Sequence, residues 1–225
     1  MRTKTDKSAV EYVVPSLRAA RRWHPIGTAM MSPWRARVHR AELLPQDGGV
    51  LIIANHLSYL DGPMVYAHCP RYVHMIVKKE AFKSIAGYAL RRSGQIPIDR
   101  AGSDRRALNA GLDVLRRGDV LGLFPEGTRG NGAGSAIRNG AAWLALQAKV
   151  PIVPVAVLGT KLPGDTKALP PFGRKVDIVY GEPLQIDAAP GQTGRALREE
   201  VSRQLGAALS TGLAEAAELT GQRLP

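Results

Sequence analysis

Short apolar runs alternate with longer amphipathic segments along this chain. The runs lack internal polar positions, which is typical of strands that are covered on both faces. The clearest runs are 50–54 (VLIIA), 120–124 (VLGLF) and 152–158 (IVPVAVL). Weaker patterns predict further strands at 73–77, 96–98 and 176–181.

The segments between these runs have helical spacing of apolar residues. Residues 103–117 carry leucines on one stripe, with Ser103 as a candidate N-cap and Gly118 as the stop. A second helix is predicted at 139–149, and a third opens at Thr193 with apolar residues at four-residue steps. Strands that alternate with helices predict an α/β fold, with a mostly parallel or mixed central sheet covered by helices.

The N-terminal part is basic and contains tryptophan. In residues 15–31 we expect Pro25 to interrupt any single helix. With Trp23 and Trp34, the segment can lie at a lipid headgroup layer or can be a terminal helix packed on the core. We therefore divide the chain into a basic segment at 1–40 that can associate with a membrane, a core at 41–190 and a C-terminal helix at 191–225.

Composition narrows the class of protein. The 225 residues carry a net charge of +12, which favours polyanionic partners such as an anionic membrane, nucleic acid or phosphorylated substrates. Sparse aromatic residues and the lack of zinc-ligand spacing make nucleic acid an unexpected partner. The only cysteine, Cys69, has no activating pattern around it, so we expect an inert thiol rather than a nucleophile. No apolar run reaches the ~20 residues of a membrane span, and the N-terminus does not resemble a secretory signal.

The heptapeptide NHLSYLD, residues 55–61, follows the first apolar run. A helix should begin here, with Asp61 either as its N-cap or as the acid of a capping box with Ser58. The same position, after a strand and before a helix, is where α/β proteins place their sites. If the turn folds His56 back onto Asp61, the carboxylate fixes the imidazole tautomer and leaves the other nitrogen as a base. From this stretch alone, the structural and catalytic interpretations both stay open.

Two further strand ends carry charged residues. FPEGTRG, residues 124–130, places Glu126 and Arg129 on a loop, and GQIPIDR, residues 94–100, ends with Asp99 and Arg100. Surface ion pairs are the simpler explanation for these charges. Two arginines at neighbouring strand ends can also form a forked phosphate site.

These stretches, together with VPIVPV at 150–155, resemble the four ordered blocks of the PlsC-type 1-acylglycerol-3-phosphate acyltransferases. The resemblance covers about residues 35–185 and implies the glycerolipid acyltransferase-like fold. It implies that His56 is the general base and that Asp61 orients it. The acceptor hydroxyl would then attack an acyl thioester directly, without an acyl-enzyme, and acyl-CoA or acyl carrier protein would serve as co-substrate without any further cofactor or metal.

The resemblance also implies residues for the acceptor. They are Lys79, Arg100, Glu126, Gly127, Thr128 and Arg129. The prolines of the fourth block, Pro151 and Pro154, are associated with donor binding or with packing. Pro97 departs from the aromatic residue that the second block often has, and the chain lacks the membrane-inserting helices with which many relatives begin.

The sequence therefore predicts an enzyme that acylates lysophosphatidic acid to phosphatidic acid, attached peripherally to the cytoplasmic face of the cell membrane. A different lysolipid or a glycolipid as acceptor is the first alternative, because the same dyad would serve. A non-enzymatic binder of anionic lipid or nucleic acid is the second, and it requires that His56 be dispensable.

Overall fold

The computed structural model describes residues 15–84, 86–100, 104–125, 139–165, 169–186 and 194–223. A seven-stranded sheet runs through this part of the chain in the order β1-β7-β6-β2-β5-β3-β4. Its strands are β1 Arg35–His39, β2 Val50–Ala54, β3 Val73–Lys78, β4 Ile96–Ile98, β5 Val120–Leu123, β6 Ile152–Leu158 and β7 Lys175–Tyr180. The helices are α1 Leu17–Met31, α2 Asp61–His68, α3 Ala86–Arg92, α4 Arg105–Arg116, α5 Asn139–Ala148 and α6 Gly194–Thr220, with short 3-10 turns η1 Ala41–Leu43 and η2 Lys79–Lys83.

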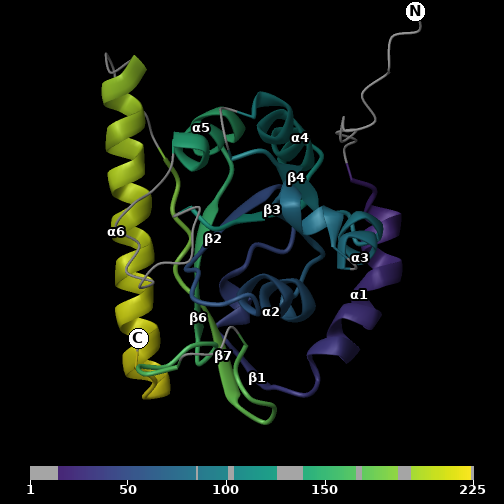
Figure 1. The fold of residues 1–225 in the computed structure, drawn as a ribbon. Helices are drawn as coiled ribbons and strands as arrows, with labels where there is room; N and C mark the ends of the chain where they lie inside the picture. The colour runs from purple at the N-terminus through teal and green to yellow at the C-terminus, as the bar shows by residue number, and fades with distance from the viewer. Residues whose placement is uncertain are drawn as a thin grey trace, which may run out of the picture.

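The sheet is mixed, as predicted. All neighbouring strands pair in parallel except β6 and β7, which are antiparallel. Helices cover both faces of the sheet, with α6 on one side and α1 and α2 on the other (Figure 1). The predicted α/β fold class is confirmed.

Alternation along β2 explains why its apolar run has no polar position. Leu51 and Ile53 belong to the apolar cluster formed with α4, α5 and α6. Val50 and Ile52 belong to the cluster on the opposite face, which includes residues of α2. Because successive side chains point to opposite faces, a strand between two helical layers must be apolar throughout.

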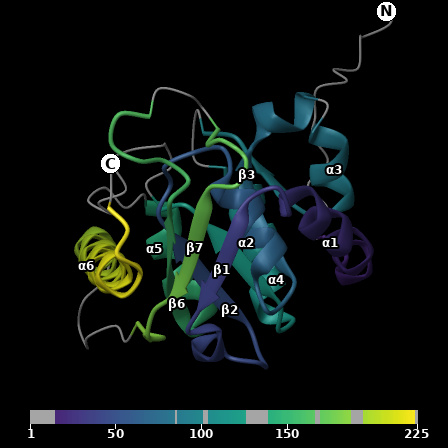
Figure 2. The same ribbon diagram turned by 90° about the horizontal axis from the view of Figure 1, so that it is seen from below.

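The strand β1 was not predicted. Its sequence, RARVH, is mostly polar because β1 is an edge strand and much of its surface is exposed. In the view from below, β1 and β7 run side by side, between α6 and α2 (Figure 2). The sheet therefore extends into residues that the sequence assigned to the N-terminal segment.

The buried carboxylate of Asp177 joins β1, β7 and the chain after α6. Asp177 of β7 accepts hydrogen bonds from Arg37 Nε at 2.7 Å and Gln222 Nε2 at 2.6 Å, and it lies 2.7 Å from His39 Nε2. Burial opposes ionisation of Asp177, but bonds from Arg37, Gln222 and His39 outweigh it and hold its pKa below the ordinary value. The chain beyond α6 is thereby fixed to β1 and β7.

Three details of the N-terminal and helical predictions need correction. Pro25 does not interrupt α1, which continues to Met31 because its inner side packs on α2 and α3. Trp34 does not face a headgroup layer: it is buried, and its Nε1 donates to Pro170 O at 3.2 Å. The N-cap of α4 is Asp104, whose side chain accepts from Ala107 N. The predicted cap Ser103 and the predicted helix start Thr193 lie outside the described residues.

Candidate active site

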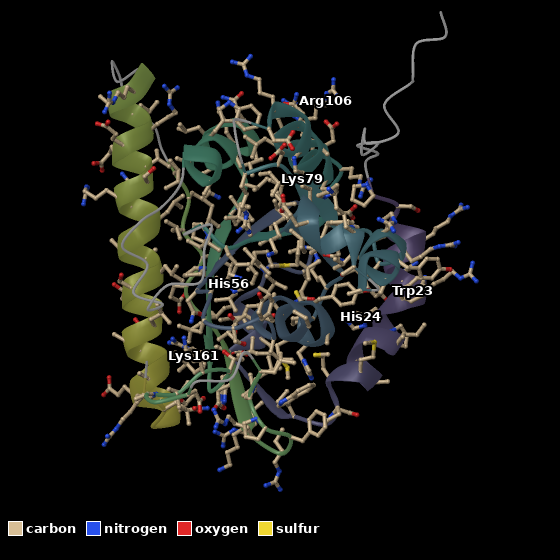
Figure 3. The ribbon with its side chains drawn as sticks, viewed as in Figure 1. Trp23, His24, His56, Lys79, Arg106 and Lys161 are labelled. Atoms are coloured by element: carbon tan, nitrogen blue, oxygen red, sulfur yellow. The ribbon has the colours of Figure 1, made fainter. Side chains whose placement is uncertain are left out.

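The carboxyl ends of five parallel strands form one edge of the sheet. The order β6-β2-β5-β3-β4 places Thr160, His56, Phe124, Lys79 and Asp99 along this edge in turn. In Figure 3, His56 lies between Lys79, which follows β3, and Lys161, which follows β6. The edge therefore collects most of the described polar residues that the sequence singled out.

The predicted contact between His56 and Asp61 is present. His56 Nδ1 lies 2.9 Å from Asp61 Oδ2, and the same oxygen accepts from Leu57 N at 2.6 Å and Ser58 N at 2.7 Å. The helix α2 begins at Asp61 with Leu60 as its N-cap, so the prediction of Asp61 as N-cap is wrong. The bond from Ser58 N to Asp61 is the one expected of a capping box, and the same oxygen also faces the imidazole, so the structural and catalytic interpretations are compatible. An oxygen that already accepts two N–H groups makes Nδ1 the protonated nitrogen and leaves Nε2 able to accept a proton.

Asp61 is fully buried, whereas the His56 side chain keeps 15% of its surface exposed. A buried carboxylate needs a donor for each oxygen, and Asp61 Oδ1 accepts from Thr160 Oγ1 at 2.5 Å. The ring of Phe124 stacks on the imidazole at a centroid distance of 4.2 Å and an interplanar angle of 13°. One face of the imidazole is therefore covered, and the ring is held between its carboxylate and an aromatic side chain.

Asn55, the residue before His56, ties β2 to β6. Its Nδ2 donates to Val157 O at 3.0 Å, and its Oδ1 accepts from Val157 N at 2.7 Å. The amide imitates the backbone of one more strand residue, so β2 ends at Ala54 and the chain turns at His56.

The candidate acceptor residues are only partly described. Lys79 forms an ion pair with Asp99, and the hydrogen bond that Lys79 donates to this carboxylate raises the lysine pKa. Arg100 follows β4 at the same edge. The other four predicted positions, Glu126, Gly127, Thr128 and Arg129, lie outside the described residues.

Other sequence candidates lie away from the dyad or in its scaffold. Pro154 is paired with Ile53 inside the sheet, and its ring packs near Gly181 and Gly212, which indicates a packing role. Cys69 is buried, and burial raises its thiol pKa, which fits an inert thiol. Within the described part of the chain, no three His, Cys, Asp or Glu side chains are grouped so that they could hold a metal ion.

Sequence reasoning did not identify Thr160 or Phe124 as site residues. Phe124 is the last residue of the run predicted as a strand at 120–124, and Thr160 lies two residues after the strand predicted at 152–158. Their place at the edge could be inferred, but neither is a residue type that titrates near neutral pH. Only the pairing of β6 and β5 with β2 brings them to His56 and Asp61.

Comparison with known proteins identifies the family. A family model described as Acyltransferase matches residues 35–158. The chain is 31% identical over 156 residues to the 1-acyl-sn-glycerol-3-phosphate acyltransferase of Bacillus subtilis, covering 68% of this chain and 76% of the relative. It is 34% identical over 155 residues to the enzyme of that name from Streptococcus pneumoniae, covering 67% of this chain and 56% of the relative.

A more distant bacterial relative and a solved structure complete the comparison. The lyso-ornithine lipid O-acyltransferase of Pseudomonas aeruginosa is 34% identical over 110 residues, 48% of this chain and 42% of that relative. The crystal structure of the 1-acyl-sn-glycerophosphate (LPA) acyltransferase PlsC from Thermotoga maritima has the same fold, with a TM-score of 0.64 at 21% identity over 87% of this chain and 79% of that one. Together with the match over more than half of its length, these similarities show that the chain belongs to the acyltransferase family.

Proposed function

We propose that this protein transfers a fatty acyl group from an acyl thioester to the free hydroxyl of lysophosphatidic acid, which gives phosphatidic acid. The observation that carries the proposal is the imidazole of His56, oriented by buried Asp61 and partly exposed at the carboxyl edge of the sheet. The names of the Bacillus and Streptococcus relatives support this choice of acceptor.

The dyad supports direct transfer. Nε2 of His56 takes the hydroxyl proton as the acceptor oxygen bonds to the thioester carbonyl carbon. The carbon–sulfur bond of the resulting tetrahedral intermediate then breaks, and the imidazolium returns the proton to the leaving thiolate. Positioned base catalysis of this kind contributes about 10² to 10⁴ in rate.

The residues beyond β5 support a phosphorylated acceptor. Neighbouring strands are ~4.8 Å apart, so the end of β3, two strands from β2, lies roughly 10 Å from the end of β2. Lys79 and Arg100 extend from the ends of β3 and β4, within side-chain reach of a phosphate whose glycerol hydroxyl lies at His56. We include Arg129 in the same phosphate site by its position in the FPEGTRG block, with Glu126, Gly127 and Thr128 beside it.

The donor is acyl-CoA or acyl carrier protein, used as a co-substrate. Both present the acyl group as a thioester, which is the only donor chemistry that the dyad requires. No further cofactor enters the proposed reaction.

We also propose peripheral attachment at the cytoplasmic face of an anionic membrane. None of the helices in the described ranges has the length and apolar character that crossing a bilayer requires. Arg18, Arg21 and Arg22 are exposed on α1, and Met30 at its end is 60% exposed. The loop before β7 presents Phe172, which is 76% exposed and borders an open cavity of about 510 Å³. Basic and apolar groups on one protein suit a headgroup layer.

A second acceptor deserves a direct comparison, because one relative is named a lyso-ornithine lipid O-acyltransferase. The test is thiol release from palmitoyl-CoA with lysophosphatidic acid, lyso-ornithine lipid and monoacylglycerol. We expect lysophosphatidic acid to be used best, and Arg100→Ala to raise KM for it more than for monoacylglycerol. An equal rise in KM for both acceptors would show that Arg100 does not bind the phosphate. If lyso-ornithine lipid were used best, it would replace lysophosphatidic acid as the proposed acceptor.

A further inference from the structure

The carboxylate of Asp61 is held from both sides. Oδ2 accepts from Leu57 N and Ser58 N and faces His56 Nδ1. Oδ1 has a different partner, the hydroxyl of Thr160, at 2.5 Å. Thr160 is 2% exposed and lies 99 positions further along the chain, so this contact depends on tertiary structure alone.

The backbone fixes the position of this hydroxyl. Gly159, the residue before Thr160, has φ of +84°, a left-handed conformation that favours glycine. A Cβ atom at Gly159 would lie 2.2 Å from Lys175 O, so no other residue fits without moving β7. Thr160 therefore begins a turn whose path is set by β6, β7 and the segment after α6, rather than by its own side chain.

We propose that Thr160 is a positioning residue for the acyl transfer, holding the Asp61 carboxylate in the rotation that directs Oδ2 at His56 Nδ1. This inference rests on the proposed function, because it gives His56 the role of base. The backbone N–H groups of Leu57 and Ser58 both donate to Oδ2. They alone would let the carboxylate rotate about its Cβ–Cγ bond, because neither of them holds Oδ1. A hydroxyl donor at Oδ1 stops that rotation and supplies the partner that a buried oxygen needs.

The geometry separates this role from simple packing. Valine has nearly the shape of threonine but no donor, whereas serine keeps the donor and loses a methyl group. If the hydroxyl positions Asp61, activity should follow the donor; if Thr160 only fills space, activity should follow the volume. Thr160 lies just beyond the match to the family model, which ends at residue 158.

The test compares Thr160→Val and Thr160→Ser with Thr28→Val. Thr28 of α1 is the control because its hydroxyl bonds only to backbone carbonyls, Ala67 O of α2 at 3.0 Å and His24 O at 3.1 Å. The readouts are kcat and KM for thiol release with lysophosphatidic acid, and the Nδ1–H resonance of His56 in protein labelled with ¹⁵N-histidine. That resonance is assigned by its loss in His56→Gln.

We expect Thr160→Val to lower kcat about tenfold, equivalent to ~1.4 kcal/mol of activation free energy, with KM nearly unchanged. The His56 Nδ1–H signal should shift or broaden in the same variant. Thr160→Ser should restore both, and Thr28→Val should leave both at wild-type values.

Wild-type kcat in Thr160→Val, or a loss of kcat with an unmoved Nδ1–H signal, would overturn the proposal. Should Thr160→Val fail to fold, Thr160→Ala removes the same donor and is judged by the same two readouts. Failure of the proposed function is distinguishable, because His56→Gln would then turn over normally whatever Thr160 does.

Discussion

The side-chain amide of Asn55 forms hydrogen bonds to both the N–H and the C=O group of Val157. Asn55 stands at the end of β2 and Val157 lies in β6, so a side chain continues the pairing that the backbone of β2 has just left. The backbone at residues 55 and 56 is thereby free to turn. His56 lies at the sheet edge because the side chain of Asn55 makes the hydrogen bonds that the backbone of a further β2 residue would make.

Asn55→Ala should destabilise the fold. It leaves two buried backbone groups of Val157 without partners, and each such group costs about 1–3 kcal/mol. We expect the free energy of unfolding to fall by roughly 2–4 kcal/mol in urea titrations. A loss below ~0.5 kcal/mol would mean that water or a shifted backbone satisfies Val157, and that Asn55 does not hold the turn.

Phe124 should affect catalysis more than stability. Its ring covers one face of the His56 imidazole at 4.2 Å, and Phe124 itself is partly exposed. Phe124→Ala should lower kcat by roughly three- to tenfold by letting the imidazole rotate, while Phe124→Tyr should keep most of the activity. Steady-state kinetics of the two variants provide the measurement. Equal activity of both variants would show that the stacking contributes nothing to the reaction.

His74 should make the fold less stable in mild acid. Burial lowers its pKa, although its Nδ1 contacts Gly94 O at 2.8 Å, so the folded protein holds a neutral imidazole where the unfolded chain binds a proton. Stability from the neutral ring is complete above about pH 6.5 and decreases as the pH falls towards the folded-state pKa, by at most ~1.4 kcal/mol per pH unit. In His74→Gln the unfolded chain cannot bind a proton at this position, so this variant should lose less stability between pH 7 and pH 5 in urea titrations. Parallel losses in both proteins would contradict this role.

Basic residues of α1 should contribute to membrane binding. Removing Arg18 and Arg22 together, as glutamines, should weaken binding to anionic phosphatidylglycerol vesicles by roughly 30-fold, at ~1 kcal/mol per residue. The control changes two arginines on α6, Arg195 and Arg203, which form ion pairs with Glu199 and Glu200. Sedimentation with vesicles measures both pairs. If the two double variants lose binding equally, net charge rather than α1 determines attachment.

The central strands could be predicted because a strand buried on both faces has apolar residues at every position. β2 and β6, which are buried at every position, begin and end where their apolar runs do. The same rule could not find β1, since an edge strand carries RARVH with little burial. Pro25 was misjudged for a related reason: local propensity opposes a helix there, and packing of α1 on α2 and α3 outweighs it.

The site was predictable where its residues are neighbours in sequence. His56 and Asp61 share one turn, so their spacing and the following helix start indicated a contact. Thr160 and Phe124 reach the same point only through strand pairing, and a lone threonine or phenylalanine after a strand carries no pattern that predicts its partner.

The most direct test of the account is thiol release from palmitoyl-CoA in the presence of lysophosphatidic acid, measured for wild type and His56→Ala. The account predicts that the wild type releases thiol in step with phosphatidic acid formation. His56→Ala should lose at least about 10²-fold in kcat while keeping wild-type unfolding behaviour. Unchanged turnover in a folded His56→Ala protein would contradict it.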